Sequence, residues 1–172
     1  MLDVIVGLDP TISFQENIPM KLDPIFTVKE NKLYKIDSQT QVDPASLKKI
    51  EIKWSQVELA EESYNEEYLA SLRDELKAMD DAGTFAILIP VLDKPLENAD
   101  QLELFINAFN HTARRVKDCV SVVGFELPEE IIAKGFDEGS PAVNFMETLA
   151  IKHAQYVYFA KNAKAPENIV II

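Results

Sequence analysis

Three carboxylates follow an apolar run in the second half of the sequence. The run covers 118–125, and Glu126, Glu129 and Glu130 come directly after it. A nearly continuous apolar run is typical of a strand buried on both faces. Ligands bind at the carboxyl ends of parallel strands, because the loops that leave this end do not have to pack in the core. We therefore place any site for ligand binding or acid-base chemistry at the end of this strand. The alternative is that these acids are solvated, or cap a short helix that starts at Pro128.

Alternating strands and helices would position these carboxylates. Strands are expected over 50–54, 84–92, 119–126 and 155–160, with a further one over 168–172. Helices are expected between them, beginning with capping boxes at Ser63 and Asp100 and with the pair Ser140-Pro141. Gly83 can supply the left-handed cap that ends the first helix. The alternation predicts an α/β fold with parallel strand pairing in one domain, 1–172, with a repeat region over 49–160.

The segment before the repeat region has a different pattern. Two β-rich runs flank a polar turn at 29–32, which predicts an N-terminal hairpin over 24–36. Further upstream, 2–7 is expected to be a short strand or an extended arm. This opening segment lacks the basic region of a signal peptide. We therefore expect a cytoplasmic protein if the start is native, and a secreted one if a signal peptide was removed.

Composition excludes several classes of partner. The 172 residues carry a formal charge of −12, whereas nucleic acid and anionic membranes bind through clustered Lys and Arg. We therefore expect neither as a partner. Two distant histidines and the single Cys119, expected to be a small buried hydrophobe, give no metal-binding pattern. A Gly-rich phosphate loop and a serine nucleophile elbow are absent from the sequence, so no cofactor is expected.

Two longer motifs resemble a known family. The first begins Lys-Trp-Ser-Gln-Val-Glu at 53–58 and continues with Tyr-Asn-Glu-Glu-Tyr-Leu at 64–69 and the apolar strand to Leu92. The second is Val-Val-Gly-Phe-Glu-Leu-Pro-Glu-Glu-Ile at 122–131. Together they resemble the second to fourth strands of cellulase-like glycoside hydrolases of family 5, whose fourth strand ends Gly-aromatic-Glu-x-x-Asn-Glu-Pro. The resemblance implies a partial TIM-like (β/α) barrel of about five parallel strands, with the hairpin as a small β-cap.

The resemblance also implies roles for individual residues. Glu130 matches the general acid/base glutamate, Glu129 replaces the asparagine that binds the sugar 2-hydroxyl, and Ile131 replaces the proline. Lys49 lies near the place of a strand-two arginine. The family's nucleophile is a glutamate on a late strand, and it has no match here. The resemblance therefore implies a truncated and catalytically degenerate relative.

A second carboxylate would be needed for hydrolysis. A retaining glycosidase holds its two carboxyl groups about 5 to 5.5 Å apart, and an inverting one holds them about 6.5 to 9.5 Å apart. Glu129 is a poor partner for Glu130, because neighbours on an extended backbone point to opposite faces. Asp93, at the end of the preceding strand, and Glu126 are the remaining candidates.

Three interpretations follow. The preferred one is a degenerate half-barrel that completes its core as a homodimer or with a partner chain and retains a carbohydrate-binding cleft around Trp54, Asp93 and Glu130. The Trp54 ring would stack on a sugar there, although packing beneath a loop is the preferred alternative for a lone tryptophan. The second interpretation is an active O-glycosyl hydrolase that uses Glu130. The third is a non-enzymatic interaction module.

Overall fold

A five-stranded parallel sheet forms the centre of the molecule. A computed structural model describes residues 22–172, so the strand predicted over 2–7 lies outside the described residues. Within this range the sheet has the order β11-β10-β9-β8-β5, and every neighbouring pair is parallel. Strands that follow one another along the chain are therefore neighbours in the sheet, as in a (β/α) barrel. The predicted α/β fold with a partial barrel is confirmed.

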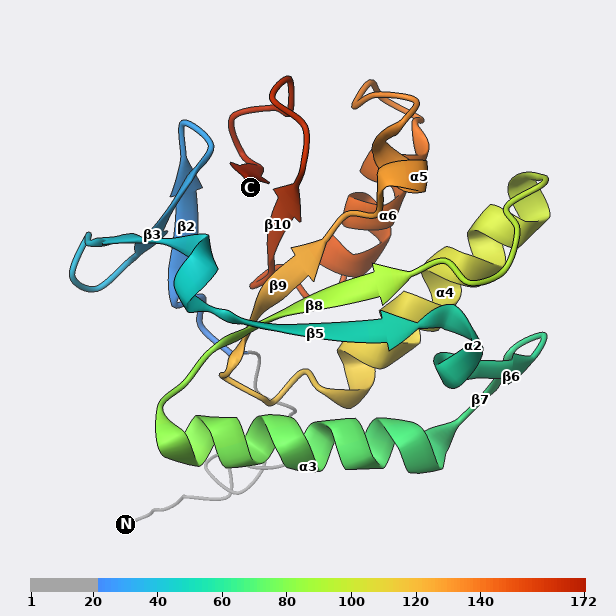
Figure 1. Cartoon of the computed structure of the whole chain (residues 1–172), viewed down its shortest axis with the longest axis horizontal. Helices are drawn as coiled ribbons and strands as arrows, with labels where there is room; N and C mark the ends of the chain where they lie inside the picture. The colour runs from blue at the N-terminus through green and yellow to red at the C-terminus, as the bar shows by residue number, and fades with distance from the viewer. Residues whose placement is uncertain (1–21) are drawn as a thin grey trace, which may run out of the picture.

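The strands lie close to their predicted positions. They are β5 (Lys48–Lys53), β8 (Ala86–Val91), β9 (Val122–Glu126), β10 (Val157–Ala160) and β11 (Val170–Ile171). Figure 1 shows them fanning apart, with the helices along one side of the sheet. The apolar run before β9 is longer than the strand, because Cys119 lies in the turn that precedes it. Burial, together with the nearby Asp118 carboxylate, raises the pKa of this thiol to about 11, so Cys119 behaves as a small core residue.

Helix α3 (Glu66–Ala82) connects β5 to β8, and its start differs from the prediction. The N-cap is Asn65, whose side-chain oxygen accepts a hydrogen bond from the amide of Tyr68 at 3.1 Å. Ser63 cannot cap the helix, because it belongs to the short strand β7 (Ser63–Tyr64), which pairs with β6 (Glu58–Ala60). The predicted end is correct, since Gly83 adopts the left-handed conformation at φ 73°.

Two further long helices complete the layer. The N-cap of α4 (Ala99–Arg115) is Asn98, so the capping box predicted at Asp100 is wrong. Helix α6 (Pro141–Ala150) begins as predicted, with Ser140 as the N-cap and proline in the first turn. The one-turn helix α2 (Trp54–Val57) after β5 was not predicted. The one-turn helix α5 (Glu129–Ile132) after β9 has Pro128 as its N-cap, which agrees with the short helix given as the alternative for these acids. Among residues 22–172 no helix has the length and apolarity needed to cross a membrane.

The predicted N-terminal hairpin is present and extends into a small antiparallel sheet. It pairs β2 (Phe26–Lys29) with β3 (Lys32–Lys35), and β4 (Gln41–Val42) follows, with the short helix η1 (Pro44–Ser46) after it. Glu30 and Asn31 both have positive φ, as a two-residue type I′ turn requires. The Asn31 amide group donates to carbonyl oxygens of the loop before β11, at 2.7 Å to Pro166 and 2.8 Å to Ile169. These bonds hold the hairpin tip against the far edge of the sheet.

The sheet separates two apolar clusters. The larger lies between the sheet and the helices and includes Phe105, Phe109, Phe125 and Phe145. The smaller lies on the other face of the sheet, which we call the inner face. There, buried side chains of β8 to β11 pack against Phe26 and Leu33 of the hairpin. The hairpin therefore covers the apolar part of the inner face.

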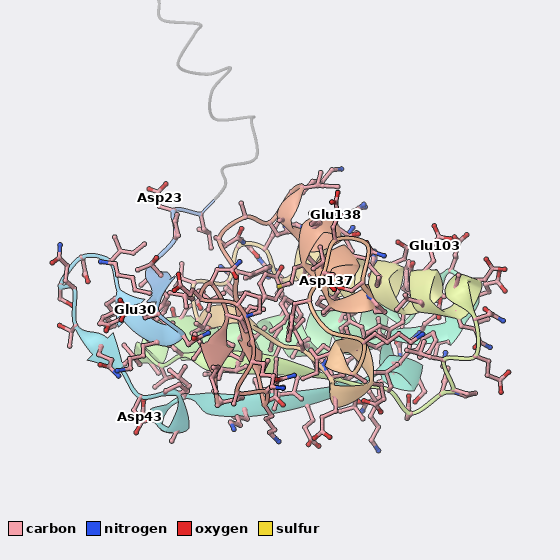
Figure 2. The ribbon with its side chains drawn as sticks, turned by 90° about the horizontal axis from the view of Figure 1, so that it is seen from above. Asp23, Glu30, Asp43, Glu103, Asp137 and Glu138 are labelled. Atoms are coloured by element: carbon pink, nitrogen blue, oxygen red, sulfur yellow. The ribbon has the colours of Figure 1, made fainter. Side chains whose placement is uncertain are left out.

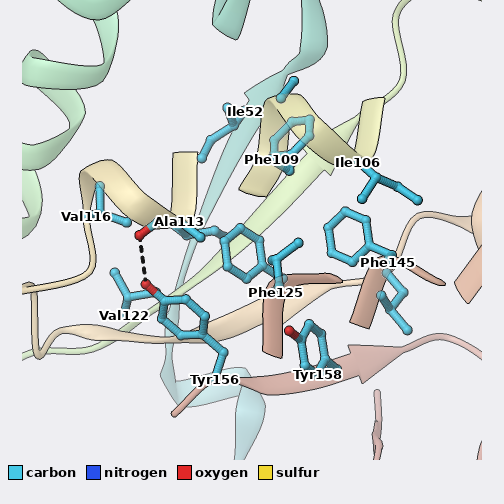
Figure 3. Close-up of a cluster of buried hydrophobic side chains, with 14 of the residues drawn as sticks. Ile52, Ile106, Phe109, Ala113, Val116, Val122, Phe125, Phe145, Tyr156 and Tyr158 are labelled. Atoms are coloured by element: carbon cyan, nitrogen blue, oxygen red, sulfur yellow. Dashed lines mark hydrogen bonds between the residues drawn. The ribbon is translucent and has the colours of Figure 1, made fainter. Parts of the chain in front are cut away.

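Two neighbouring tyrosines in the larger cluster have different surroundings (Figure 3). Both side chains are buried, and burial raises the pKa of each hydroxyl above its ordinary value. The Tyr156 hydroxyl donates to the carbonyl oxygen of Ala113 at 3.4 Å. The Tyr158 hydroxyl has no hydrogen-bond partner in the part of the chain that the structure describes. An unpaired buried hydroxyl is costly, so Tyr158 carries an energetic penalty that Tyr156 avoids.

Removing each hydroxyl is therefore expected to change stability in opposite directions. Tyr158→Phe should raise the free energy of unfolding by about 1 kcal/mol, because the unpaired hydroxyl disappears. Tyr156→Phe should lower it by about 0.5 to 1 kcal/mol through loss of a long hydrogen bond. Urea denaturation of both variants measures the difference. A loss of stability in Tyr158→Phe would mean that its hydroxyl has a partner.

Candidate functional site

The parallel strands bring several polar residues to one edge of the sheet. Strand β9 ends at Glu126 itself. Strands β5, β8 and β10 end at Lys53, Val91 and Ala160, and the segments that follow them carry Ser55, Asp93 and Lys161. We call this the carboxyl edge. It is the edge at which barrel enzymes place their sites.

Glu126 is buried at this edge. It lies on the inner face of β9, since its neighbours Phe125 and Leu127 both point into the cluster on the helix side. Its exposed fraction is only 7%. One carboxylate oxygen, Oε2, lies 3.8 Å from Nζ of Lys161, while Oε1 has no hydrogen-bond partner among residues 22–172. A buried carboxylate oxygen without a partner is energetically costly, so Oε1 is an acceptor that the described residues leave unused.

Glu129 and Glu130 lie outside the strand. Pro128 ends the extended backbone, and both glutamates occupy the first turn of α5. Their side chains are exposed, whereas those of Ile131 and Ile132 are buried in the cluster on the helix side. Ile131 therefore anchors the short helix, and the two carboxylates are left in solvent.

Asp93 is held by the segment after β5. Its Oδ1 accepts a hydrogen bond from the Ser55 amide at 3.0 Å, and its Oδ2 accepts a second from the Ser55 hydroxyl. Burial alone would raise the pKa of this carboxyl, but the two bonds from Ser55 outweigh it, and the pKa lies below its ordinary value. Asp93 is therefore ionised at neutral pH and ties two loops of the carboxyl edge together.

Trp54 does not provide an exposed stacking face. Its exposed fraction is 2%, its ring packs edge-on against Phe105 with centroids 5.4 Å apart, and Lys94 Nζ lies 4.7 Å from the ring centroid. The indole nitrogen donates to the buried Glu58 carboxylate at 2.8 Å. The prediction of a sugar-stacking Trp54 is corrected: the ring lies in the core because α2 starts at Trp54 and turns it toward the helices, which leaves the packing alternative.

Lys49 is also distant from the carboxyl edge. It pairs with Ile87 near the start of β5, four residues before the strand ends. At a rise of about 3.3 Å per residue this corresponds to about 13 Å along the strand. Its side chain is exposed on the inner face, because Ile50 and Ile52 point to the helix side. The placement of Lys49 in the binding site is therefore corrected.

The predicted candidates do not form one cluster. Among the described residues, no hydrogen bond or ion pair joins Asp93 to Glu126 or to Glu130. The sequence reasoning missed Lys161 and Ser55, which contact Glu126 and Asp93. Lys161 directly follows a predicted strand, and Ser55 belongs to the first motif. The sequence therefore contained enough information to name both residues as site candidates. Within residues 22–172, no group of three or more His, Cys, Asp or Glu side chains is arranged to hold a metal ion.

Large cavities lie elsewhere in the structure. One of about 930 Å³ is bounded by the hairpin sheet and the end of α3, and includes Lys35 and Phe85. Another of about 640 Å³ lies between the hairpin and α6, and includes Tyr158. Neither contains Glu126, Asp93 or Glu130. Acidic side chains are distributed over the hairpin, α4 and the loop before α6 (Figure 2), so the net charge is not concentrated at one site. We give the carboxyl edge more weight than the cavity volumes, because it combines a buried unpaired carboxylate with the expected position in the fold.

Comparisons with known proteins show similarity at the level of the fold. No family model matches the sequence, and no curated protein matches it significantly. Among solved structures, endo-glycoceramidase II from Rhodococcus sp. in a cellobiose-like imidazole complex is 12% identical with a TM-score of 0.53, and the match covers 86% of this chain and 54% of that chain. Another structure of that protein gives 14% identity and a TM-score of 0.52, with 88% and 54% covered. A GH5_18 protein from Bifidobacterium longum subsp. infantis gives 11% identity and a TM-score of 0.48, with 65% and 33% covered.

The chain thus spans about half the length of the endo-glycoceramidase structures, whose fold is of the family 5 type. The shared part includes most of the described sheet and helices, because the match covers 86% to 88% of this chain. The chain therefore has the fold of a partial (β/α) barrel of the kind found in family 5 glycoside hydrolases.

Proposed function

We propose that this chain is a glycoside-hydrolase-like (β/α) unit that binds a saccharide at its carboxyl edge and has lost the family's catalytic pair. The observation that carries the proposal is Glu126, whose buried Oε1 has no partner in the described part of the chain. Sugars present adjacent hydroxyl groups, and a carboxylate accepts hydrogen bonds from hydroxyls strongly. The fold likeness to family 5 structures supports a saccharide over other hydroxyl donors.

Loss of catalysis is supported by the surroundings of the remaining carboxylates. A carboxyl group that donates a proton at neutral pH is ordinarily held in an apolar pocket or beside another carboxylate. Glu130 is exposed instead, and both carboxylate oxygens of the ionised Asp93 accept hydrogen bonds from Ser55. We therefore assign neither Glu130 as a protonated acid nor Asp93 as a free nucleophile. Glu129, exposed beside Glu130, remains a candidate for contacts to the saccharide.

Neutralising Glu126 tests the binding site. The wild-type chain should bind at least one member of a panel of immobilised oligosaccharides, and Glu126→Gln should weaken that binding at least tenfold. A hydrogen bond to a charged group is worth about 1.5 to 3 kcal/mol, and about 1.4 kcal/mol corresponds to a factor of ten. Glu103→Gln, an exposed acid on α4, is the matched control and should bind like the wild type.

Two outcomes of this experiment would count against the proposal. If the wild-type chain binds no saccharide in a broad panel, carbohydrate binding is wrong. If Glu126→Gln and the wild type bind equally, the site lies elsewhere.

The second candidate function is an active glycosidase with Glu130 as the general acid/base. It is favoured by the position of Glu130 at the carboxyl end of a strand that is parallel to both neighbours. Hydrolysis of aryl glycosides that disappears in Glu130→Gln would establish this function in place of the binding-only one.

Self-association remains a prediction. The hairpin covers the apolar part of the inner face, so less apolar surface is left for a second copy than an open half-barrel would expose. The described edge strand β5 carries Lys48, Lys49 and Lys53, and lysines on an edge strand disfavour pairing with another strand. Light scattering of the full chain decides between a monomer and a dimer.

A further inference from the structure

A polar groove lies on the helix side of the sheet, where the proposed saccharide site does not reach. It has a volume of about 380 Å³ and lies between α4 and α6, beside β7. Four lining residues come from one face of α4, since Asn107, Asn110, His111 and Arg114 are spaced three and four apart. Glu126 points to the opposite face of the sheet. The groove is therefore separate from the carboxyl edge.

The lining of this groove has an unusual charge for this protein. The chain has 29 Asp and Glu against 17 Lys and Arg, yet the groove contains no acidic residue. It contains Arg114 from α4 and Lys152 from the turn after α6, together with His111 and His153. Neither Arg114 nor Lys152 forms an ion pair within residues 22–172. Two cations without an ion-pair partner in the described part of the chain therefore line one polar groove.

Neutral hydrogen-bonding groups lie between the cations. Asn107 and Asn110 line one wall and Thr148 the other. The side-chain oxygen of Asn110 is buried and has no partner in the described part of the chain. This oxygen is an acceptor, so a hydrogen bond from Asn110 to an oxyanion would come from the amide nitrogen. The groove thus offers amide and hydroxyl groups beside two charged ones.

His111 is held by its neighbours and is largely buried. Its side chain is only 15% exposed, and its ring stacks on Tyr64 with centroids 4.2 Å apart and an interplanar angle of 16°. Its Nε2 lies 2.8 Å from the Glu66 carboxylate, which also contacts Arg115. Glu66 therefore offsets charge at one end of the groove, and Arg114 and Lys152 carry the uncompensated charge.

We propose that this groove binds a small oxyanion, the phosphate or carboxylate group of a small molecule. Arg114 and Lys152 supply the charge from opposite walls, and the amide groups of Asn107 and Asn110 with the hydroxyl of Thr148 supply directed hydrogen bonds. A guanidinium fork matches the geometry of either oxyanion. The inference does not depend on saccharide binding, because the two sites use different residues on different faces of the sheet.

A titration followed by 1H–15N correlation spectra tests this proposal. The full chain is titrated with inorganic phosphate and, separately, with malonate, with ionic strength held constant by sodium chloride. The expected result is a saturable shift of the signals of Asn107, Asn110 and Thr148 with at least one of the two anions. The anion that binds more tightly distinguishes phosphate from carboxylate. The double variant Arg114→Gln/Lys152→Gln should weaken binding at least tenfold.

Lys134→Gln is the control. Lys134 is exposed and lies outside the groove, and its substitution changes the net charge in the same direction as the double variant. It should bind the anion like the wild type. Shifts that do not saturate, or that the double variant retains in full, would overturn the proposal. The spectra report folding of each variant in the same experiment, so loss of binding is distinguished from loss of structure.

Discussion

Replacing Gly124 with alanine is expected to lower the free energy of unfolding by about 4 kcal/mol, a large loss against the roughly 5 to 15 kcal/mol of a typical domain. A β-carbon at position 124 would lie 1.6 Å from the carbonyl oxygen of Val157, and within 2.7 Å of two further backbone atoms of that residue. These atoms belong to the neighbouring strand β10, so no side chain can move aside to make room. Strands β9 and β10 would have to separate at the place where Glu126 is positioned.

Gly83→Ala is the matched control for this prediction. Position 83 also favours glycine, because its φ is 73°, but a β-carbon there would have no heavy atom within 4 Å. Only the cost of the left-handed conformation remains, about 1 to 2 kcal/mol. Urea denaturation measures both variants. Equal losses of stability in Gly83→Ala and Gly124→Ala would contradict the close approach of β9 and β10.

The second large effect is expected at Glu58. This carboxylate is 2% exposed and accepts hydrogen bonds from the indole nitrogen of Trp54 at 2.8 Å and from the amide of Glu62 at 2.9 Å. Lys94 Nζ lies 3.7 Å from the same carboxylate. Glu58→Ala would leave the two donors without their acceptor. It would also remove the carboxylate beside Lys94, whose hydrogen bond to the main-chain carbonyl of residue 58 at 3.2 Å would remain. We expect the free energy of unfolding to fall by about 3 kcal/mol. This is the lower end of the range for breaking a buried ion pair, because the Lys94 side chain is 34% exposed.

The single tryptophan reports this change directly. Its fluorescence should shift to longer wavelength in folded Glu58→Ala, because Trp54 loses its hydrogen bond and gains access to water. Glu75→Ala is the control: Glu75 pairs with Lys48 at 2.9 Å, but both side chains are about half exposed. Such a surface pair contributes about 0 to 1 kcal/mol. A Glu58→Ala variant as stable as Glu75→Ala would show that the Trp54 cluster is not held by Glu58.

The parts of the fold that sequence could predict are those with strong local patterns. The apolar run of β8 and the stripe of α4 from Phe105 to Val116 both gave the correct element. The start of α3 was wrong by two residues because Ser63 and Asn65 are both good caps, and the choice depends on the pairing of β7 with β6. The pairing of β7 with β6 depends on tertiary structure, so the local capping pattern cannot predict it.

The candidate site was harder to predict, because its contacts join distant parts of the chain. Glu126 and Lys161 are separated along the chain by α5, α6 and β10, and only the parallel register of β9 with β10 brings them together. Asp93 and Ser55 meet for the same reason across β5 and β8. The sequence therefore identified the edge of the sheet, but it ranked Glu130 above Glu126. The structure reverses this ranking because of burial. The chain turns at Pro128 and leaves Glu130 in solvent, whereas Glu126 is buried at the sheet.

The central claim is that a ligand binds at the carboxyl edge beside Glu126. The most direct test is a 1H–15N titration of the full chain with the oligosaccharide that binds best in the panel. The account predicts that the amide signals of Ser55, Leu127 and Lys161 shift first and saturate together. Shifts confined to the cavity between the hairpin and α3, around Phe26 and Phe85, would contradict it.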